Sequence, residues 1–488
     1  MIRTIRSQLV RPSGIGGWTR GLGSALPIIA SLLGSHTACA QQASADTFAI
    51  RYKGITLQPV GYFAAEAVWR ERDESADIGS SFNAIPFDGT TQSKLNEFRA
   101  SARQSRIGAY VTGKVPAATL SGLWESDFLA SGTGSNSNES NSYVLRLRQF
   151  WGQAAFKGGF TLTAGQTWSL LTTNKSGIAT RQESSPAVID AQYSAGFDWS
   201  RQWAIRLTQN INNHVWLAFA AEEPEMTFSS RGTPNPTVLI GTAGGNQLNA
   251  TTNYSVDPAP DLIAKIAIEP GFGHYEIKAV GRVMRDRIFD SAGAFGGTRN
   301  STTEAGGVGA AAIWSFGKAV DIGVSGLWGR GIGRYGTSQL ADATLRADGT
   351  IVPIRAAHAL LSIEAHPSKK LDIDAYGGLE YAYREGSFNA TGGGVGYGST
   401  LNNNSGCTTE LYPTGSYVPV AGTCNADTRV VYQGNIQSWY RFYKGPAGTF
   451  QWGLQYSYTA RDAWSGANGI TPHAIDGMVF TSIRYNIP

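Results

Sequence analysis

Charged residues are scarce in this sequence, at 16% of 488 residues, against roughly 25% in ordinary soluble domains. This scarcity excludes a highly charged disordered chain. Beyond the first 40 residues there is also no uninterrupted apolar run long enough for a membrane-spanning helix, which argues against a helical membrane protein. Glycine (60 residues) and aromatic side chains (11%) are abundant instead. Aromatic segments separated by glycine are typical of β-strands joined by turns.

The first 40 residues have the pattern of a secretory signal. An apolar stretch at 22–33 follows a basic region, and Ala38-Cys39-Ala40 supplies a small-x-small cleavage pattern. We therefore expect a signal peptide over residues 1–40, cleaved after Ala40. A lipoprotein signal ending at Cys39 is the alternative, although the residues before it form a poor lipobox. The basic residues of this region are Arg3, Arg6, Arg11 and Arg20.

Net charge gives no support for an acidic partner. The chain carries 40 basic and 36 acidic residues, and four of the basic residues lie in the predicted signal, so the remainder is neutral. Binding of nucleic acid depends on an excess of basic residues. We therefore expect no nucleic-acid partner.

Cysteine is also scarce, with three residues in the chain. Cys407 and Cys424, the two that follow the signal, lie in one stretch rich in Gly, Ser, Thr and Asn. A single loop-closing disulfide between them fits an exported protein. A metal pair is disfavoured because no His or further Cys lies nearby in the sequence.

After the signal, alternating strands come in pairs that are joined by tight turns and separated by long polar loops. Seven turns and eight loops connect sixteen strands, which predicts an all-β fold: a 16-stranded antiparallel transmembrane β-barrel over 53–488, with short periplasmic turns and long extracellular loops. Residues 41–52 would form a short periplasmic segment. The turns lie at 116–117, 158–159, 212–213, 271–273, 317–318, 367–370 and 445–448. The loops lie at about 73–93, 131–142, 174–202, 229–259, 290–302, 334–353, 389–429 and 465–473.

The predicted strands alternate between apolar and polar residues. In 450–460, Phe450 and Trp452 share one face, and Gln451 and Gln455 share the other. Polar inward faces indicate a wet lumen. A soluble β-sandwich would need a dry core and a more charged outer face, and a β-solenoid would show a short fixed repeat, which the sequence lacks.

The candidate functional residues are arginines on the lumen-facing side of the strands. Arg146 and Arg148 lie two residues apart in one strand, so both point inward. Rings of arginine in a pore favour anions, whereas pairing with inward acids such as Glu125 is the alternative. Arg106 matches the inward phase of its strand, whereas Arg99 and Arg103 do not, so we expect a bulge near Gln104. The candidates are Arg106, Arg146, Arg148, Arg206, Arg282, Arg441, Arg461 and Arg484.

Two long loops differ from the others. The loop at 174–202 is too apolar for an external loop, so we expect it to fold into the lumen and narrow it; contact with a neighbouring subunit or loop is the alternative. The loop at 389–429 is long and external and carries the predicted disulfide. The candidate charged residues of the constriction loop are Arg181, Glu183 and Asp190.

Signals for an enzyme are weak. Residues 331–336 match the bare glycine spacing of a dinucleotide site, but no helix follows, which favours a glycine-rich strand end. The sequence has no G-x-S-x-G motif, and its histidines lack metal-ligand spacing. We expect no catalytic residue, no cofactor and no metal site.

Several segments resemble the DcaP-like outer-membrane porins. The likeness is clearest at 98–107, 145–153, 164–170 and 480–485, and it spans most of 53–488. It implies a sixteen-stranded trimeric porin in the outer membrane of a Gram-negative bacterium, passing small and often anionic organic solutes. Under this resemblance, Arg106, Arg146 and Arg148 would be bases of the pore wall. The sequence departs from the family in lacking the N-terminal coiled coil of some members and in ending without a terminal aromatic residue.

Three hypotheses for function follow. The first is a porin for passive diffusion of small hydrophilic solutes, with a preference for small organic anions and a homotrimeric state. The second is a plugged structural or adhesive barrel whose external loops bind a partner. The third is a barrel enzyme, which no sequence motif supports.

Overall fold

The computed structural model describes residues 49–130, 144–243, 253–411 and 423–488. The chain divides into two units, Met1–Thr47 and Phe48–Pro488, and the account below concerns the second. Among the described residues, no helix is long and apolar enough to cross a membrane. Several predicted features lie wholly or partly outside the described residues: the signal peptide 1–40, the segment 41–52, and the loops at 131–142, 229–259 and 389–429.

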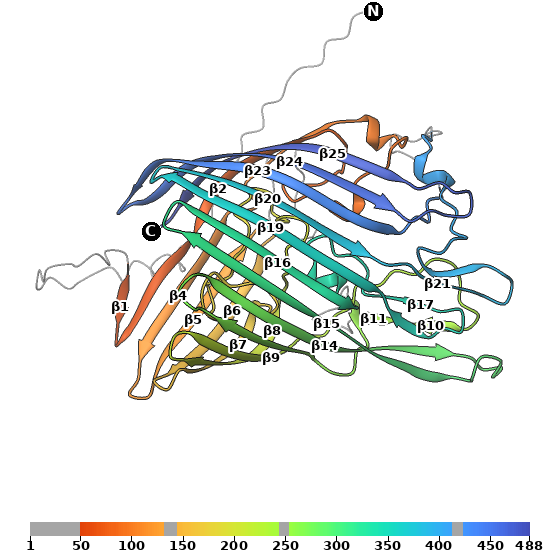
Figure 1. Cartoon of the computed structure of the whole chain (residues 1–488), viewed down its shortest axis with the longest axis horizontal. Helices are drawn as coiled ribbons and strands as arrows, with labels where there is room; N and C mark the ends of the chain where they lie inside the picture. The colour runs from red at the N-terminus through yellow and green to blue at the C-terminus, as the bar shows by residue number, and fades with distance from the viewer. Residues whose placement is uncertain (1–48, 131–143, 244–252, 412–422) are drawn as a thin grey trace, which may run out of the picture. The chain divides into compact units, whose positions relative to one another are not determined.

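The described strands form one closed antiparallel β-barrel (Figure 1). Sixteen strands make its wall when β3 and β4 are counted as one, and β25 pairs with β2 to close the sheet. The predicted fold class is therefore confirmed. The wall strands are β2 (Ile55–Arg70), β3 (Glu97–Ser101), β4 (Arg106–Lys114), β5 (Ala118–Asp127), β6 (Arg146–Phe156), β7 (Phe160–Trp168), β8 (Arg201–Ile211), β9 (Val215–Glu222), β13 (Asp261–Ile268), β14 (His274–Phe289), β15 (Arg299–Phe316), β16 (Val320–Arg330), β19 (Arg355–Ser368), β20 (Leu371–Ala382), β23 (Thr428–Gly445), β24 (Gly448–Ala463) and β25 (His473–Asn486).

Tight turns join the hairpins at one end of the barrel, and all seven lie where the sequence predicts them. Asn212 and Asn213 both have φ of 56°, the left-handed conformation that matches a two-residue turn to the twist of its strands. The opposite end carries long loops with short strands and 3-10 helices. These are β10 (Thr237–Leu239), β11 (Gly241–Ala243), β12 (Asn253–Ser255), β17 (Ala343–Leu345), β18 (Ile351–Pro353), β21 (Glu385–Phe388), β22 (Gly394–Tyr397), η1 (Phe82–Ala84), η2 (Gln92–Lys94), η3 (Gly333–Tyr335) and η4 (Ser405–Thr408). A further strand, β1 (Ile50–Tyr52), pairs with the start of β2 at the turn end.

The second wall strand is interrupted between β3 and β4. Both pieces pair with β2, with Ser101 opposite Glu66 and Arg106 opposite Tyr62, so residues 102–105 bulge out of the ladder. This is the bulge that the sequence predicts near Gln104. Next to the bulge, Gly61 lies opposite Ile107 with φ of 136°, and a Cβ there would lie 2.2 Å from the carbonyl oxygen of Arg106. The close approach requires glycine at this position.

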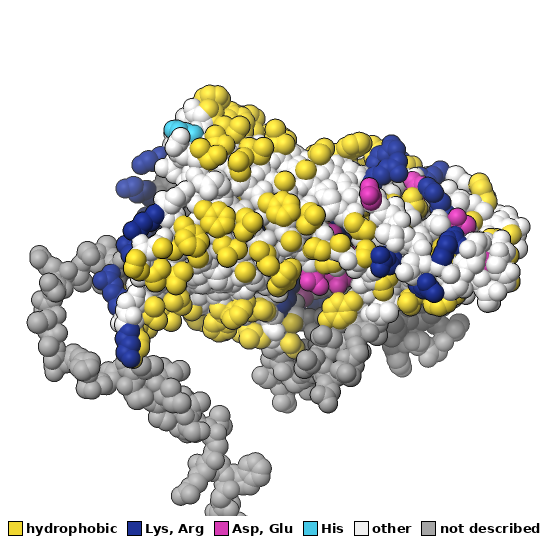
Figure 2. Space-filling model, turned by 90° about the horizontal axis from the view of Figure 1, so that it is seen from below, with side chains coloured by type: hydrophobic (Ala, Val, Ile, Leu, Met, Phe, Trp, Pro, Cys, Tyr) yellow, Lys and Arg dark blue, Asp and Glu magenta, His cyan; other side chains and the backbone are white. Residues whose placement is uncertain are grey.

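The outer face of the wall is apolar. In β24, Phe450, Trp452 and Leu454 are exposed, while Gln455 and Ser457 on the opposite face are buried. Figure 2 shows hydrophobic side chains covering the wall, with lysine and arginine gathered at the turn end and mixed charges at the loop end. The alternation therefore has the apolar-out, polar-in sense expected of an outer-membrane barrel.

The interior is partly filled by loops. Ile189 and Ala195 of the loop between β7 and β8 are fully buried, as are Leu340 and Ile354 of the loop between β16 and β19. The first of these inward loops was expected from its apolar composition; the second was not. The loop between β20 and β23 contains the disulfide Cys407–Cys424, which confirms the predicted pairing.

Candidate functional site

Arginines gather on the inner wall beside the loop between β7 and β8. We call this group the arginine cluster and define it by five residues on β4, β6, β8 and β25: Arg106, Arg146, Arg148, Arg201 and Arg484. Four of these residues are among the predicted candidates. The fifth, Arg201, is the first residue of β8 and lies within the range predicted as loop. Three carboxylates on neighbouring strands bond to members of the cluster: Glu66, Glu125 and Asp127.

Arg146 and Arg148 share one carboxylate on the adjacent strand. Asp127 receives Nε and Nη2 of Arg146 at 2.9 and 2.7 Å, and Nη1 of Arg148 at 2.7 Å. Arg148 also donates through Nε to Glu125 at 2.7 Å. The Arg148 side chain is 2% exposed, whereas that of Arg146 is 36% exposed. Arg146 can therefore contact a solute directly, whereas Arg148 is buried and held by its two carboxylates.

A tyrosine of β2 lies between two further arginines of the cluster. The ring of Tyr62 has the guanidinium of Arg106 at 5.1 Å and that of Arg484 at 4.8 Å from its centroid, both within the range of cation–π attraction. Arg484 also donates to Glu66 at 2.7 and 2.9 Å. Arg106 has no ion pair with any described residue, so its charge is not offset by a bonded carboxylate.

Arg201 is held by aromatic side chains. Its guanidinium lies 4.9 Å from the ring centroid of Trp168 and 4.8 Å from that of Trp199, and Nη1 donates to the hydroxyl of Tyr193 at 3.3 Å. Within the described parts of the chain, it forms no ion pair. The only sequence signal for Arg201 was its place between aromatic residues at a strand end.

Tyr193 connects the arginine cluster to the loop between β7 and β8, residues 169–200, for which we keep the name constriction loop. Its hydroxyl receives Nη2 of Arg148 at 3.2 Å as well as the bond from Arg201. Burial raises the pKa of the Tyr193 phenol, but the guanidinium groups of Arg148 and Arg201 outweigh it and hold that pKa at about 7. A phenol poised in this way titrates close to neutral pH.

Side chains of the wall bind the backbone of the constriction loop. Carboxylates of Glu222, Glu276 and Glu380 accept from the backbone N–H groups of residues 170, 174 and 196 at 2.7 to 2.9 Å. Lys265 donates to the carbonyl oxygen of residue 172 at 2.7 Å, and Lys278 donates to that of residue 171. All five wall residues are buried. The path of the loop is thus set mainly by wall charges bonded to its main chain.

Three predicted loop residues occupy different settings. Arg181 is exposed and lies 4.2 Å from the ring centroid of Tyr110 on the arginine side of the lumen. Asp190 is buried and accepts from the backbone N–H groups of Ser80 and Gln192 at 3.1 and 2.9 Å. Burial raises the pKa of the Asp190 carboxyl above its usual value. Glu183 is partly buried and forms a β-bridge with Asn174, and burial raises its pKa as well.

The other predicted arginines lie apart from the cluster and are bonded to loops or acids. Arg206 is buried and donates to the carbonyl oxygen of Trp168. Arg282 is buried between Asp261 at 3.0 Å and Asp342 at 3.1 Å. Arg441 pairs with Asp372 near the turn end. Arg461 donates to Thr428 and to the carbonyl oxygen of Ile85 at 2.9 and 3.0 Å. These four arginines fix loops or balance acids.

A cavity of about 520 Å³ lies at the loop end beside the arginine cluster. Arg146, Arg201 and Arg334 line it together with Glu223 and Glu225. A volume of this order accommodates a small organic molecule. The cavity is therefore a candidate mouth through which a solute reaches the arginine cluster.

The fold is similar to that of a known outer-membrane channel. The DcaP channel of Acinetobacter baumannii is similar at 15% identity, over 90% of this chain and 100% of that chain, with a TM-score of 0.60. The chain is also similar to an anion-selective porin from Comamonas acidovorans, at 10% identity over 89% of this chain and 100% of that chain, with a TM-score of 0.46. OmpF of Salmonella typhi in complex with daunomycin is similar at 9% identity, over 90% of this chain and 100% of that chain, with a TM-score of 0.47.

The likeness to DcaP shows that this chain has the fold of that channel, as the sequence resemblance predicts. No protein-family model and no curated protein matches the sequence.

Proposed function

We propose that the protein is an outer-membrane porin of a Gram-negative bacterium. Small hydrophilic solutes would diffuse passively through its lumen, with a preference for small organic anions. The fold shared with the DcaP outer-membrane channel supports the porin assignment. The apolar outer wall between two polar ends supports a bilayer setting.

The arginine cluster is the observation that carries the anion preference. Five guanidinium groups lie among three carboxylates, so the described part of this wall bears an excess of positive charge. Arg106 and Arg201 lack a bonded carboxylate among the described residues, and Arg146 is partly exposed. Inward positive charge in a narrow, partly dehydrated passage attracts carboxylate and phosphate groups more strongly than it would in open water.

Reversal potential in a KCl gradient across a planar bilayer tests this proposal. We expect anion selectivity from the wild type and a shift toward cations in the double variant Arg106→Gln/Arg201→Gln. The difference should fade at 1 M salt, where the screening length falls to about 3 Å. A matched control is Arg285→Gln/Arg287→Gln, which removes two charges from the outward face of β14.

The outcomes separate the two parts of the proposal. Absence of stable conductance from correctly assembled protein would contradict the porin assignment. Stable conductance with equal selectivity in the wild type and the cluster variant would leave a general porin and remove the anion preference. An equal shift in the control variant would assign the effect to overall charge.

A plugged barrel is the second candidate because two loops enter the interior. The loop between β16 and β19 is buried along most of its length, including Tyr335, Leu340 and Asp342. It packs beside the constriction loop, since the backbone N–H of Trp199 donates to the carbonyl oxygen of Tyr335 at 2.7 Å. Such a barrel would use its external loops to bind a partner. The same bilayer recordings decide, because a plugged barrel gives no stable conductance steps.

Several further assignments belong to this proposal. Residues 1–40 would be a signal peptide, 41–52 a periplasmic segment and 53–488 the barrel, with 174–202 as its constriction loop and 389–429 as a long external loop. We also propose a homotrimer, which cross-linking of native membranes can test. We propose no enzymatic activity and no nucleic-acid partner.

A further inference from the structure

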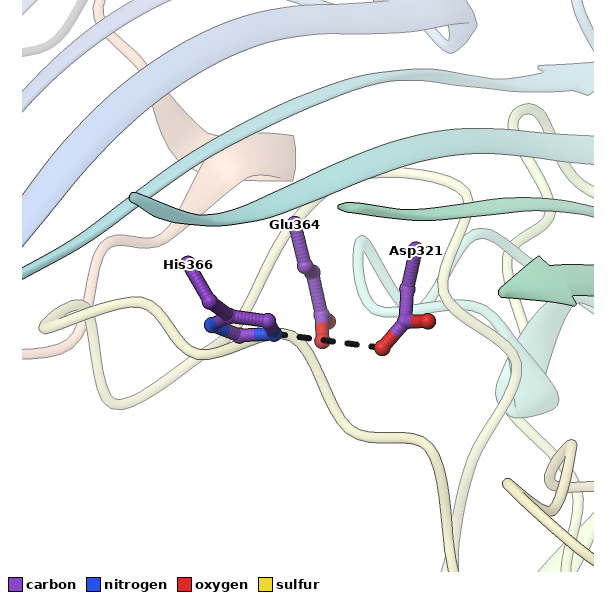
Figure 3. Close-up of side chains that lie close together, drawn as sticks. All are labelled: Asp321, Glu364 and His366. Carbon is purple, nitrogen blue, oxygen red and sulfur yellow. Dashed lines mark ion pairs between the residues drawn. The ribbon is translucent and has the colours of Figure 1, made fainter. Parts of the chain in front are cut away.

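Three potential metal ligands converge on the inner wall near the turn end of the barrel. Asp321 of β16, and Glu364 and His366 of β19, each offer a ligand atom, and these atoms all lie within 4.8 Å of one another. Figure 3 shows the three side chains pointing toward one another, and its dashed line joins His366 Nε2 to Asp321 Oδ2, which lie 3.8 Å apart. We call these three residues the turn-end cluster. Its side chains are 37%, 13% and 36% exposed in the order given, so the cluster is accessible from the lumen.

The sheet register places a surplus of carboxylates here. Asp321 lies directly opposite Glu364, and Glu364 lies directly opposite Asp374 of β20. Three acids therefore form one row across three neighbouring strands on the inner face, and like charges directly opposite each other destabilise a sheet. Asp374 is 2% exposed and accepts one hydrogen bond, from Gln437 at 3.4 Å. It has no ion pair among the described residues, so no cation there balances the charge that it carries when ionised.

The nearby cations neutralise little of this surplus negative charge. Lys175 of the constriction loop lies with Nζ 3.5 Å from Glu364 Oε2, and its side chain is 53% exposed, so the pair is weak. Arg441 is bonded to Asp372 and balances that carboxylate. The row thus presents three carboxylates to one loosely held lysine and one imidazole.

The orientation of His366 suits a metal ligand. Its Nδ1 lies 2.9 Å from Asp372 Oδ1, and Arg441 in turn holds Asp372. A carboxylate on one ring nitrogen fixes the tautomer that carries the proton there and leaves the lone pair of the other nitrogen free. That other nitrogen, Nε2, faces Asp321. Metal-binding histidines generally have this outer carboxylate.

We propose that the turn-end cluster binds a divalent transition metal ion, best represented by Zn²⁺, on the lumen wall. One imidazole and two carboxylates form a donor set that such ions accept, with water completing the coordination. A tetrahedral zinc with bonds of about 2.1 Å holds its donor atoms about 3.4 Å apart. The exposed ends of Asp321 and His366 can close this distance, while Tyr376, which donates to Glu364 Oε1 at 2.7 Å, leaves Oε2 for the metal.

Binding of Zn²⁺ to the purified full-length barrel tests the proposal by titration calorimetry, independently of any transport function. We expect one zinc ion per chain in the wild type and loss of this binding in His366→Ala and in Asp321→Asn/Glu364→Gln. Asp372→Asn should weaken binding by about 10- to 100-fold, because it removes the outer carboxylate. Lys175→Met should strengthen binding, because the lysine competes for Glu364.

His473 provides a matched control. Its side chain is 36% exposed, like that of His366, and its Nδ1 is also bonded to a carboxylate, that of Asp462. It belongs to no group of three metal ligands among the described residues. His473→Ala should keep the zinc site, and heat-modifiability on gels verifies that every variant has assembled.

Two results would overturn the proposal. One is a wild-type barrel that takes up no zinc, and the other is zinc uptake that survives His366→Ala. Loss of binding in His473→Ala with retention in the Asp321→Asn/Glu364→Gln variant would place the metal elsewhere and equally contradict the assignment.

Discussion

The two charged regions of the inner wall balance their charges in different ways. The arginine cluster lies on β4, β6, β8 and β25, where Asp127 and Glu66 bond to its members and the aromatic rings of Tyr62 and Trp199 cover others. The carboxylate row of Asp321, Glu364 and Asp374 lies on β16, β19 and β20 near the turn end, with one exposed lysine as its nearest loop cation. The strands that carry the two regions are about half a turn of the barrel apart in the strand order.

This difference separates charges that hold the wall together from charges that can attract an ion in the lumen. A charge that is bonded on several sides holds the wall together and changes little when a solute passes. A charge without a bonded partner is free to attract an ion. On this criterion Arg148, which is bonded to two carboxylates, is structural. Arg106 and Arg201, which have no bonded carboxylate among the described residues, and Asp321, whose side chain is 37% exposed, are available.

The largest expected effect is the loss of a bonded charge from the arginine cluster. Arg148→Ala leaves Asp127, which is fully buried, and Glu125 with fewer partners, and breaking a buried pair in this way costs about 3–5 kcal/mol. Unfolding of the refolded barrel in urea measures the change. As a control, Arg99→Ala removes a side chain that is 48% exposed and should cost about 0–1 kcal/mol. Equal stability of the two variants would break the distinction between bonded and available charge.

A smaller effect is expected from titration of Tyr193 within the same cluster. Its pKa of about 7 means that the phenol is neutral below pH 7 and negative above it. The phenolate offsets one arginine, so anion selectivity should weaken as the pH rises through 7. Reversal potentials at pH 6 and pH 8 measure this change.

Tyr193→Phe is the matched variant for the titration. It keeps the ring beside Trp168 and Trp199 and removes the ionisable hydroxyl. The variant should keep the selectivity that the wild type shows at pH 6 at both pH values. An unchanged pH dependence in the variant would assign the titration to another group.

The smallest effect is expected in the carboxylate row. Asp374→Asn removes one of two like-charged neighbours of Glu364, which should stabilise the barrel by about 0.2–1 kcal/mol in the presence of a chelator. Asp372→Asn is the contrasting variant, because Asp372 is bonded to Arg441 and His366 and its loss should destabilise. Urea unfolding with EDTA compares the two, and destabilisation by Asp374→Asn would show that its charge is balanced after all.

Most of the barrel was predictable because its signals are local. A turn such as Asn212-Asn213 is recognisable in the sequence because its residues tolerate positive φ. The alternation of apolar residues then shows which side chains of each strand point outward. The bulge near Gln104 followed from a change of phase within one strand. The disulfide followed from two cysteines in one loop.

The candidate site was less predictable because its contacts join distant strands. Arg148 meets Tyr193 of a loop, and His366 meets Asp321 of another strand. These pairings depend on register and on the path of inward loops, neither of which a strand's own sequence encodes. The burial of Leu340 and its loop was missed for the same reason, because that loop is held by residues of distant strands, such as Arg282 of β14, which pairs with Asp342.

The constriction loop is held by its main chain, and this has a consequence for engineering. Glu222, Glu276 and Lys265 bond to amide and carbonyl groups that every amino acid supplies. The wall therefore fixes the backbone path of the loop and not its sequence. Exposed side chains such as Arg181 can be substituted, while the length of the loop and the spacing of its bonded amides cannot change. New selectivities are best sought by substitution within the loop, and insertions or deletions between residues 170 and 196 should displace it from the wall.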